Sequence, residues 1–368
     1  MTSEWRTIRA ADFIDFNPRL SLKKGDIATK VAMDKLKPFT KKIPETEKAE
    51  FNGGAKFCNG DTVMARITPC LENGKTAYVD MLDDGEIGFG STEFIVMRAK
   101  KGISDPQFVY YTAINPVFRN VAIKSMVGSS GRQRVQQSVL EELELSVPDL
   151  DEQRRIGDFL ARIDEKIALN DRINDNLQQQ AQAIYSSMFI DNPDPAWSHG
   201  HLSDLITVKY GKDHKKLADG IYPVYGSGGI MRYVERPLYN KESVLIPRKG
   251  TLNNVMYVNQ PFWSVDTMFY TEMKLPNVAK FVYHFVKAKD LASMNAGSAV
   301  PSMTTDILNA MEIVIPSASA LEEFESLVAP MYEAMEANDV QSKALSQMRD
   351  TLLPKLMSGE IDVSDIQL

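Results

Sequence analysis

The chain has 368 residues, of which 43% are hydrophobic and 25% are charged, and its net charge is −7. This length and hydrophobic content exclude a disordered tail and allow two or three domains, each with its own core. Two cysteines without C-x-x-C spacing, Cys58 and Cys70, exclude a disulfide framework and imply no structural metal. The N-terminus lacks the apolar core of a signal peptide, and no run of about 18 apolar residues occurs. We therefore expect a cytoplasmic protein without a membrane segment.

The negative charge is unevenly distributed along the chain. Residues 1–149 carry a net charge of +1 and residues 196–316 carry +3, whereas residues 150–195 carry −4 and residues 317–368 carry −7. Phosphate binding depends on Lys and Arg, so a negative total charge argues at first against nucleic-acid binding. The net charge of each segment is more informative than the total. The two neutral-to-basic segments remain candidates for it.

Residues 1–149 are predicted to form a first domain of mixed α/β structure. Short β-rich runs, TVMARI (62–67), TAYVD (76–80), EFIVMRA (93–99) and LELSVP (143–148), are separated by Gly, Asn and Asp turns. A helix is expected around Phe108–Ala113. The pattern predicts a compact, curved sheet with a few helices.

Residues 150–195 are predicted to form a central helical spacer. Apolar residues recur at spacings of four and three, the period of a coiled-coil seam. They are Ile156, Leu160, Ile163 and Ile167. Asp149 or Asp151 can cap this helix. Forty helical residues would span about 60 Å, at a rise of about 1.5 Å per residue.

The chain then repeats itself, which predicts a second domain at 196–316 and a second helical spacer at 317–368. VLEELELSVP (139–148) matches ILNAMEIVIP (307–316) at an offset of 168 residues, and the apolar seam keeps that offset. PQFVYYTAI (106–114) matches AKFVYHFVK (279–287), and a weaker match places Arg66 opposite Arg248. The expected fold is therefore α+β: two α/β domains separated by two long antiparallel coiled-coil helices, with a pseudo-two-fold internal repeat.

Three residues of the predicted helices depart from an apolar seam. Asn170 and Asn338 are either buried polar residues that fix the register of the helix pair or solvated side chains. Pro330 should kink the second helix or mark an early turn.

Two motifs resemble parts of DNA-modifying enzymes. Asn115-Pro116-Val117-Phe118 is similar to the Asn-Pro-Pro-aromatic loop of adenine methyltransferases, but the second proline and a glycine-rich site for the methyl donor are missing. Asp149 with Asp164-Glu165-Lys166 fits a loose metal-nuclease pattern. The second half of that pattern falls on the predicted coiled helix, which favours a solvated face.

Two further motifs could bind a phosphate or a metal. Gly226-Ser227-Gly228-Gly229 resembles a phosphate-binding loop without the Gly-Lys-Ser/Thr that should follow, so a tight loop is favoured. His199-Gly200-His201 has no further ligands nearby and is interpreted as part of a linker. We expect no catalytic residues and no metal site in this chain.

Four segments resemble the specificity subunits of type I restriction-modification systems, and the resemblance extends over essentially the whole chain. They are GDTVMARITPCLENGK (60–75), GSSGRQRVQQSVLEELELSVPDLDEQRRIGDFL (128–160), YPVYGSGGI (222–230) and ALSQMRDTLLPKLMSGEI (344–361). The second copy departs from the pattern at 317–323, which reads SASALEE where the first copy has DLDEQRR.

This resemblance implies a non-catalytic subunit in which each domain is a target-recognition domain that reads one half of an interrupted, asymmetric DNA site. It implies double-stranded DNA, two modification (methyltransferase) subunits and restriction or motor subunits as partners. S-adenosylmethionine is expected in the modification subunit, and no cofactor is expected in this chain.

Residues that bond base edges or phosphates are mainly Arg, Lys, Asn, Ser and Thr at loops and strand ends. The candidates in the first domain are Arg66, Asn73, Lys75, Ser129, Ser130, Arg132 and Arg134. Those in the second domain are Tyr210, Lys212, Lys215, Lys216, Arg248, Lys249, Asn253, Asn254, Ser298 and Ser302. Tyr222 and Tyr225 could stack on an extruded base, although core packing is the commoner use of such aromatics.

Two other functions compete with this prediction. A degenerate methyltransferase or nuclease would bind S-adenosylmethionine or a divalent metal as an isolated chain. A coiled-coil adaptor would bind protein, and its binding would depend little on salt, whereas phosphate-mediated binding weakens steeply as salt rises.

Overall fold

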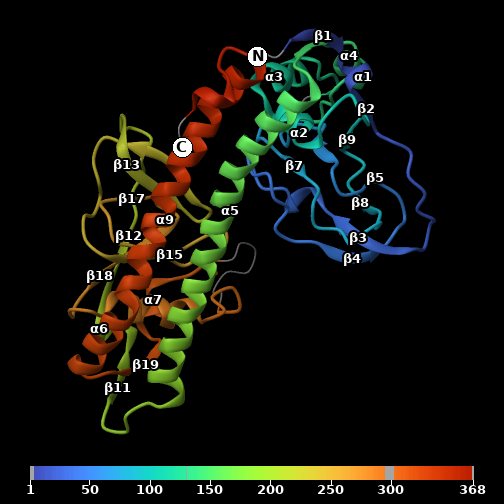
Figure 1. Cartoon of the computed structure of the whole chain (residues 1–368). Coiled ribbons are helices and arrows are strands. Elements are labelled where there is room, and N and C mark those ends of the chain that lie inside the picture. Colours follow the sequence, from blue (N-terminus) through green and yellow to red (C-terminus); the bar gives the residue numbers. More distant parts are fainter. Residues whose placement is uncertain (1–3, 130, 295–301, 367–368) are drawn as a thin grey trace. The chain divides into compact units, whose positions relative to one another are not determined.

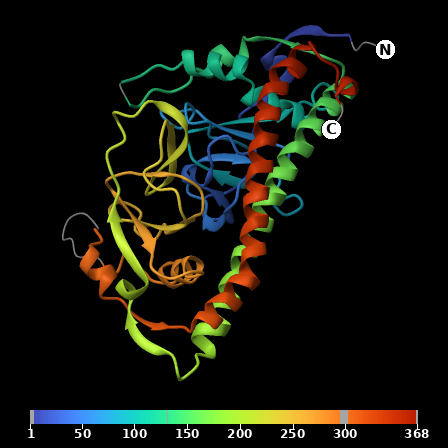
Figure 2. The same cartoon turned by 90° about the vertical axis from the view of Figure 1, so that its left-hand side faces the viewer.

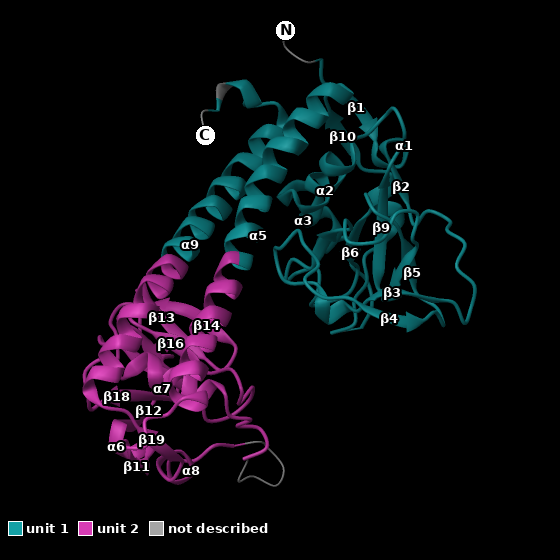
Figure 3. Ribbon diagram, turned by 60° about the horizontal axis from the view of Figure 1, so that its bottom comes forward, with its two compact units in different colours: residues 1–172, 337–368 teal, residues 173–336 magenta. Residues whose placement is uncertain are grey.

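The computed structural model describes residues 4–129, 131–294 and 302–366. The chain divides into two compact units (Figure 3), unit 1 with residues 1–172 and 337–368 and unit 2 with residues 173–336. Each unit contains one globular domain together with a part of each of two long helices. Among the described residues, no helix is long and apolar enough to cross a membrane.

Unit 1 is built on two four-stranded sheets and one two-stranded sheet, in the orders β2-β9-β6-β7, β4-β3-β8-β5 and β1-β10. The strands are β1 (Arg6–Arg9), β2 (Ile14–Phe16), β3 (Ile27–Val31), β4 (Glu47–Glu50), β5 (Ala55–Phe57), β6 (Thr62–Ala65), β7 (Thr76–Tyr78), β8 (Gly88–Gly90), β9 (Phe94–Ala99) and β10 (Glu144–Val147). The helices of its domain are α1 (Ala10–Phe13), the 3-10 turn η1 (Met33–Lys35), α2 (Pro106–Ile114), α3 (Pro116–Lys124) and α4 (Gln137–Glu141). All strand pairs are antiparallel except β3 with β8.

Helix α2 lies at the centre of the main apolar core of unit 1. Asp105 caps it by accepting the Phe108 amide, and Pro106 occupies the first turn, where its missing N–H costs nothing. Phe108 and Tyr111 are fully buried in a core that also contains residues of the two long helices. The helix predicted around Phe108–Ala113 is therefore confirmed.

Unit 2 has the sheets β12-β18-β15-β16, β14-β13-β17 and β11-β19. The strands are β11 (Ser198–His201), β12 (Ile206–Tyr210), β13 (Asp219–Gly226), β14 (Gly229–Val234), β15 (Ser243–Pro247), β16 (Met256–Val258), β17 (Trp263–Ser264), β18 (Met268–Met273) and β19 (Glu312–Ile315). The helices are the π-helical turn η2 (Ser187–Asp191), α6 (Leu202–Leu205), α7 (Ala279–Lys287) and α8 (Thr305–Asn309).

The two domains repeat the same topology. The strand order β2-β9-β6-β7 corresponds to β12-β18-β15-β16, and the parallel pair β3 and β8 corresponds to β13 and β17. The matched segments 106–114 and 279–287 are helices α2 and α7, with those same limits. The predicted fold class is thus confirmed: two mixed α/β domains, each followed by a long helix.

The long helices are α5 (Leu150–Ser186) and α9 (Ala318–Ser358), and they lie side by side (Figures 1 and 2). Asp149 accepts the Glu152 amide at 2.9 Å, so it is the residue that caps α5. A short 3-10 turn, η3 (Val363–Asp365), follows α9. Helix α9 continues past Pro330, so the early turn considered there does not occur.

The two helices run antiparallel within each unit, as predicted. In unit 1 the amide of Asn170 donates to Gln341 Oε1 at 2.9 Å and to Ser342 Oγ at 3.1 Å, and Asp164 pairs further along with Arg349. In unit 2 the amide of Asn174 donates to the carbonyl of Met335. Asn170 is fully buried and Asn338 half-buried, so Asn170 is a polar member of the seam.

Buried polar contacts attach each domain to the helices. In unit 1 Asp164 accepts the Tyr111 hydroxyl and an Arg349 N–H, each at 2.6 Å. In unit 2, His284 Nε2 lies 2.9 Å from the Tyr332 hydroxyl and His284 Nδ1 lies 2.8 Å from Gln182 Oε1. These sites correspond, because Tyr332 is 168 residues after Asp164 and His284 takes the place of Tyr111 in the matched helix.

This burial corrects one expectation from the sequence. Asp164, interpreted as part of a solvated helix face, is buried because the domain helix α2 and helix α9 both cover it. Glu165 and Lys166, the other members of that pattern, are exposed.

Candidate nucleic-acid interface

Arg248 and Tyr210 lie against each other in unit 2, where Arg248 is half-buried and Tyr210 is exposed. Arg248 follows β15, and its guanidinium lies over the Tyr210 ring, 5.4 Å from the ring centre. Tyr210 ends β12, is 52% exposed, and packs edge-on against Phe269. The guanidinium also donates to the carbonyl of Asp266 at 3.4 Å. An arginine stacked on an open aromatic face can bond a base edge or a phosphate while the ring contacts a base.

Arg66 occupies the equivalent backbone position in unit 1. The Arg66 amide donates to the carbonyl of Glu93 and its carbonyl accepts the Val135 amide; Arg248 makes the same two bonds with Thr267 and Met303. The β-bridges next to them, Ile67 with Arg134 and Lys249 with Ser302, also correspond. The weak sequence match of Arg66 with Arg248 is therefore a true structural equivalence.

The Arg66 side chain nevertheless has a different environment from that of Arg248. Both arginines are half-buried, but the Arg66 guanidinium donates to the carbonyl of Val135 at 3.2 Å. Its Nε is buried and has no hydrogen-bond partner within the described part of the chain. Arg134, beside it, is held in a bidentate pair with Glu93, and this pair lowers the pKa of the Glu93 carboxyl. Arg66 thus supports the backbone at Val135, and Arg134 supports the turn at Glu93.

The remaining candidates of unit 1 lie in two turns. Asn73 is exposed, and Lys75 donates its ammonium to the carbonyl of Met33 at 2.9 Å. Ser129 and Arg132 are exposed in the second turn, where the Arg132 amide donates to the carbonyl of Ser129. Ser130 lies outside the described residues.

Three of the remaining candidates of unit 2 follow Arg248 closely in the chain. Lys249 is exposed, and Asn254 donates to the carbonyl of Ser227 at the tip of the β13–β14 hairpin. Asn253 is tied to Asp290 at 3.0 Å. The exposed lysines of the loop after β12 are Lys212, Lys215 and Lys216. Ser302 is half-buried, and Ser298 lies outside the described residues.

The two tyrosines considered for stacking belong to the body of the domain. Tyr225 is 9% exposed and accepts the Gln260 amide, and Tyr222 is half-buried against the same core. Gly226-Ser227-Gly228-Gly229 is the tight β13–β14 turn, with Gly229 at a φ of 110° that favours glycine. The tight-loop interpretation of this motif is confirmed.

The other motifs have structural roles. Asn115 caps α3 by accepting the Val117 amide at 3.0 Å, and Phe118 is in the core. His199 and His201 lie in β11, which pairs with β19, so the linker interpretation is wrong. The pair β11 and β19 of unit 2 corresponds to the pair β1 and β10 of unit 1. Among the described residues, no three His, Cys, Asp or Glu side chains are arranged to hold a metal.

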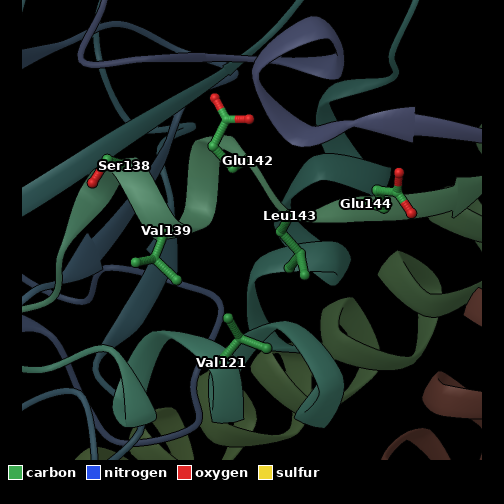
Figure 4. A pocket seen from close by; sticks show the side chains of 6 residues that line it. All are labelled: Val121, Ser138, Val139, Glu142, Leu143 and Glu144. Atoms are coloured by element: carbon green, nitrogen blue, oxygen red, sulfur yellow. The ribbon is translucent and has the colours of Figure 1, made fainter.

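An open depression lies in the surface of unit 1 (Figure 4). Its volume is about 640 Å³. The lining residues are Val121, Ser138, Val139, Glu142, Leu143 and Glu144. Carboxylates at its edge would repel phosphate, so this depression is not part of the candidate DNA interface.

One exposed aromatic residue is not among the candidates predicted from the sequence. Phe39 is 59% exposed and lies within the run KLKPFTKK (35–42). An aromatic residue among lysines is a pattern typical of nucleic-acid binding and could have identified it.

Comparison with known proteins identifies the class. The family described as "Type I restriction modification DNA specificity domain" matches residues 3–179 and 196–324, one match for each repeat. The chain belongs to this family. It is accordingly a specificity subunit, the non-catalytic DNA-recognition component of a type I restriction-modification system.

Individual relatives agree with this assignment over most of the chain. The HindI specificity subunit of Haemophilus influenzae is 22% identical, over 82% of this chain and 86% of the relative. The MjaIX specificity subunit of Methanocaldococcus jannaschii is 24% identical over 66% of each chain. The crystal structure of a type I S subunit from M. genitalium shares the fold, with a TM-score of 0.58, 18% identity and 96% coverage of both chains.

Proposed function

We propose that this chain reads an interrupted, asymmetric DNA sequence, with one half-site recognised by the domain of unit 1 and the other by the domain of unit 2. The observation that supports this most is the repeated scaffold with different side chains at equivalent positions. Arg248 stacks on exposed Tyr210, whereas Arg66 is turned toward Val135. Two copies of one scaffold with different polar surfaces should bind different bases.

The same proposal extends to the partners. Two modification subunits would bind the acidic helical segments, because carboxylates repel DNA and residues 317–368 carry a net charge of −7. Restriction or motor subunits would join the complex to cleave DNA. S-adenosylmethionine would be bound by the modification subunits and not by this chain. Because the complex would act on DNA, we expect it in the cytoplasm.

The test is methylome sequencing of cells that express the chain with its modification subunit. We expect an interrupted, asymmetric methyladenine motif that is absent without the chain. The double variant Tyr210→Ala, Arg248→Ala should relax or abolish one half of that motif and leave the other half intact. If an assembled complex yields no motif that depends on the chain, the proposal is wrong.

An isothermal titration with S-adenosylmethionine separates the roles of the subunits. The isolated chain should give no binding heat, whereas the complex with modification subunits should bind the methyl donor. Binding by the isolated chain would instead favour a degenerate methyltransferase.

A further inference from the structure

Phe39 is held in an exposed position by its neighbours in unit 1. It adopts a φ of 55°, in the left-handed region that is costly for an aromatic residue, and its amide donates to the carbonyl of Gly74 at 3.0 Å. Phe39 is 59% exposed, so burial of this side chain does not compensate for the backbone strain. Strain of this kind is kept where the surrounding structure imposes it, and it is concentrated at functional sites.

Two contacts fix the direction of the ring. It lies against Gly74, where a Cβ would be 2.6 Å from the ring atoms, so glycine is required for this packing. The guanidinium of Arg119 lies over the ring, 5.2 Å from its centre. Arg119 is in turn anchored by the backbone carbonyls of Leu71 and Glu72, the latter at 2.6 Å. The ring is therefore preorganised and has limited freedom to fold back onto the domain.

The surroundings of the ring are basic. Residues 33–44 contain four lysines and one aspartate, but one of these lysines, Lys41, is buried and donates to Gln107. Lys35 pairs with Glu45 and Lys42 pairs with Asp80, while Lys37 is exposed and forms no ion pair with any residue that the structure describes. The exposed candidate Asn73 precedes Gly74, on which the ring rests. Cations around an aromatic ring complement a nucleic-acid backbone with accessible bases, and they would disfavour a basic protein surface.

We propose that Phe39 is a specificity-determining residue that stacks on a base step of the half-site bound by unit 1, with Arg119 and Gly74 as its positioning residues. The ring enters a base step from its exposed side, as apolar wedges do in DNA-bending proteins, while the exposed Lys37 contacts a phosphate. This inference rests on the proposed DNA-reading function and adds a contact residue and its mode of contact.

The test uses the full chain assembled with its modification subunits and a duplex that carries the methylated motif. Loss of one base–aromatic stack should weaken binding by about 5- to 150-fold. Phe39→Asn should show this loss and yet retain or raise the melting temperature, because asparagine tolerates the left-handed conformation better than phenylalanine. Phe39→Trp should bind almost normally. Val117→Ala, at a 67% exposed apolar residue on α3, is the matched control.

A fluorescent base analogue reports on the mode of contact. With 2-aminopurine placed at successive positions of the half-site, one position should brighten on binding of the unchanged complex and stay quenched with Phe39→Asn. If Phe39→Asn binds within twofold of the unchanged complex, or if it lowers the melting temperature as a core residue would, the inference is overturned while DNA recognition stands. If the unchanged complex shows no sequence-specific binding, the proposed function fails and the inference fails with it.

Discussion

Removal of one partner from the Asp164–Arg349 pair should strongly destabilise unit 1. The two side chains are 5% and 7% exposed, and Asp164 also accepts the Tyr111 hydroxyl at 2.6 Å. In Asp164→Asn the Arg349 cation stays buried, with only the largely exposed Asp350 as a charge partner. Loss of one member of a buried ion pair costs about 3–5 kcal/mol. In a domain of about 150–250 residues, each kcal/mol lost lowers the melting temperature by about 2–4 °C, so the melting temperature should fall by about 6–20 °C.

The assay is thermal unfolding followed by circular dichroism, with urea titration for the free energy. Arg349→Met should cost a similar amount, because it leaves the Asp164 carboxylate buried. The double variant Asp164→Leu, Arg349→Met should recover most of the loss, since no charge then remains buried. The matched control is Glu47→Gln on β4, which removes an exposed pair with Lys30 and should cost less than about 1 kcal/mol. If Asp164→Asn and Arg349→Met lose no more free energy of unfolding than Glu47→Gln, the reasoning is refuted.

Three further predictions concern other residues. His284 is buried, and desolvation lowers its pKa to about 4 from an ordinary value of 6.5. Between these two pH values the unfolded chain therefore binds a proton at this residue that the folded chain does not bind. About 3 kcal/mol of the free energy of unfolding, present above pH 6.5, should be lost as the pH falls toward 4. Urea titrations at several pH values should show this slope, and His284→Gln should remove most of it. Asn170→Leu should raise the melting temperature, because an apolar group replaces a buried Oδ1 that has no hydrogen-bond partner among the described residues. If Asn170 specifies the helix pairing, light scattering should detect mixed oligomers of this variant. Replacing Lys212, Lys215 and Lys216 by Gln should reduce the slope of log K against log salt concentration by up to about 3 if each lysine contacts a phosphate, and an unchanged slope would show that this loop does not contact DNA.

The repeat and the helix pair could be predicted because their patterns are regular in the sequence. The seam at Ile156, Leu160 and Ile163 follows a fixed period, and the fixed offset of 168 residues aligns the two copies. These patterns depend on short-range spacing and on self-similarity, both of which a single sequence contains. The antiparallel pairing followed because each helix comes directly after a domain.

The burial of Asp164 could not be predicted in the same way. A charged residue on a helix is usually solvated, and the two groups that cover it are 53 and 185 residues away in the chain. Arg66 and Phe39 are opposite cases. Arg66, a strand-end arginine predicted to contact DNA, donates to the carbonyl of Val135. Phe39 belongs to a residue type normally found in cores, but it is exposed because Gly74 and Arg119 support it. Side-chain direction depends on tertiary neighbours.

The buried contacts between domains and helices limit how new specificities can be made by recombination. Tyr111 donates to Asp164, which pairs with Arg349, whereas His284 contacts Tyr332 and Gln182. Transplanting residues 1–149 alone into the second position would bring Tyr111 against Tyr332 and leave it without a carboxylate. A gene exchange that preserves folding must therefore carry the matching helix residues with the domain or keep each domain in its own position. Homologous exchange between related genes at the same position meets that requirement, which favours shuffling of first domains with first domains.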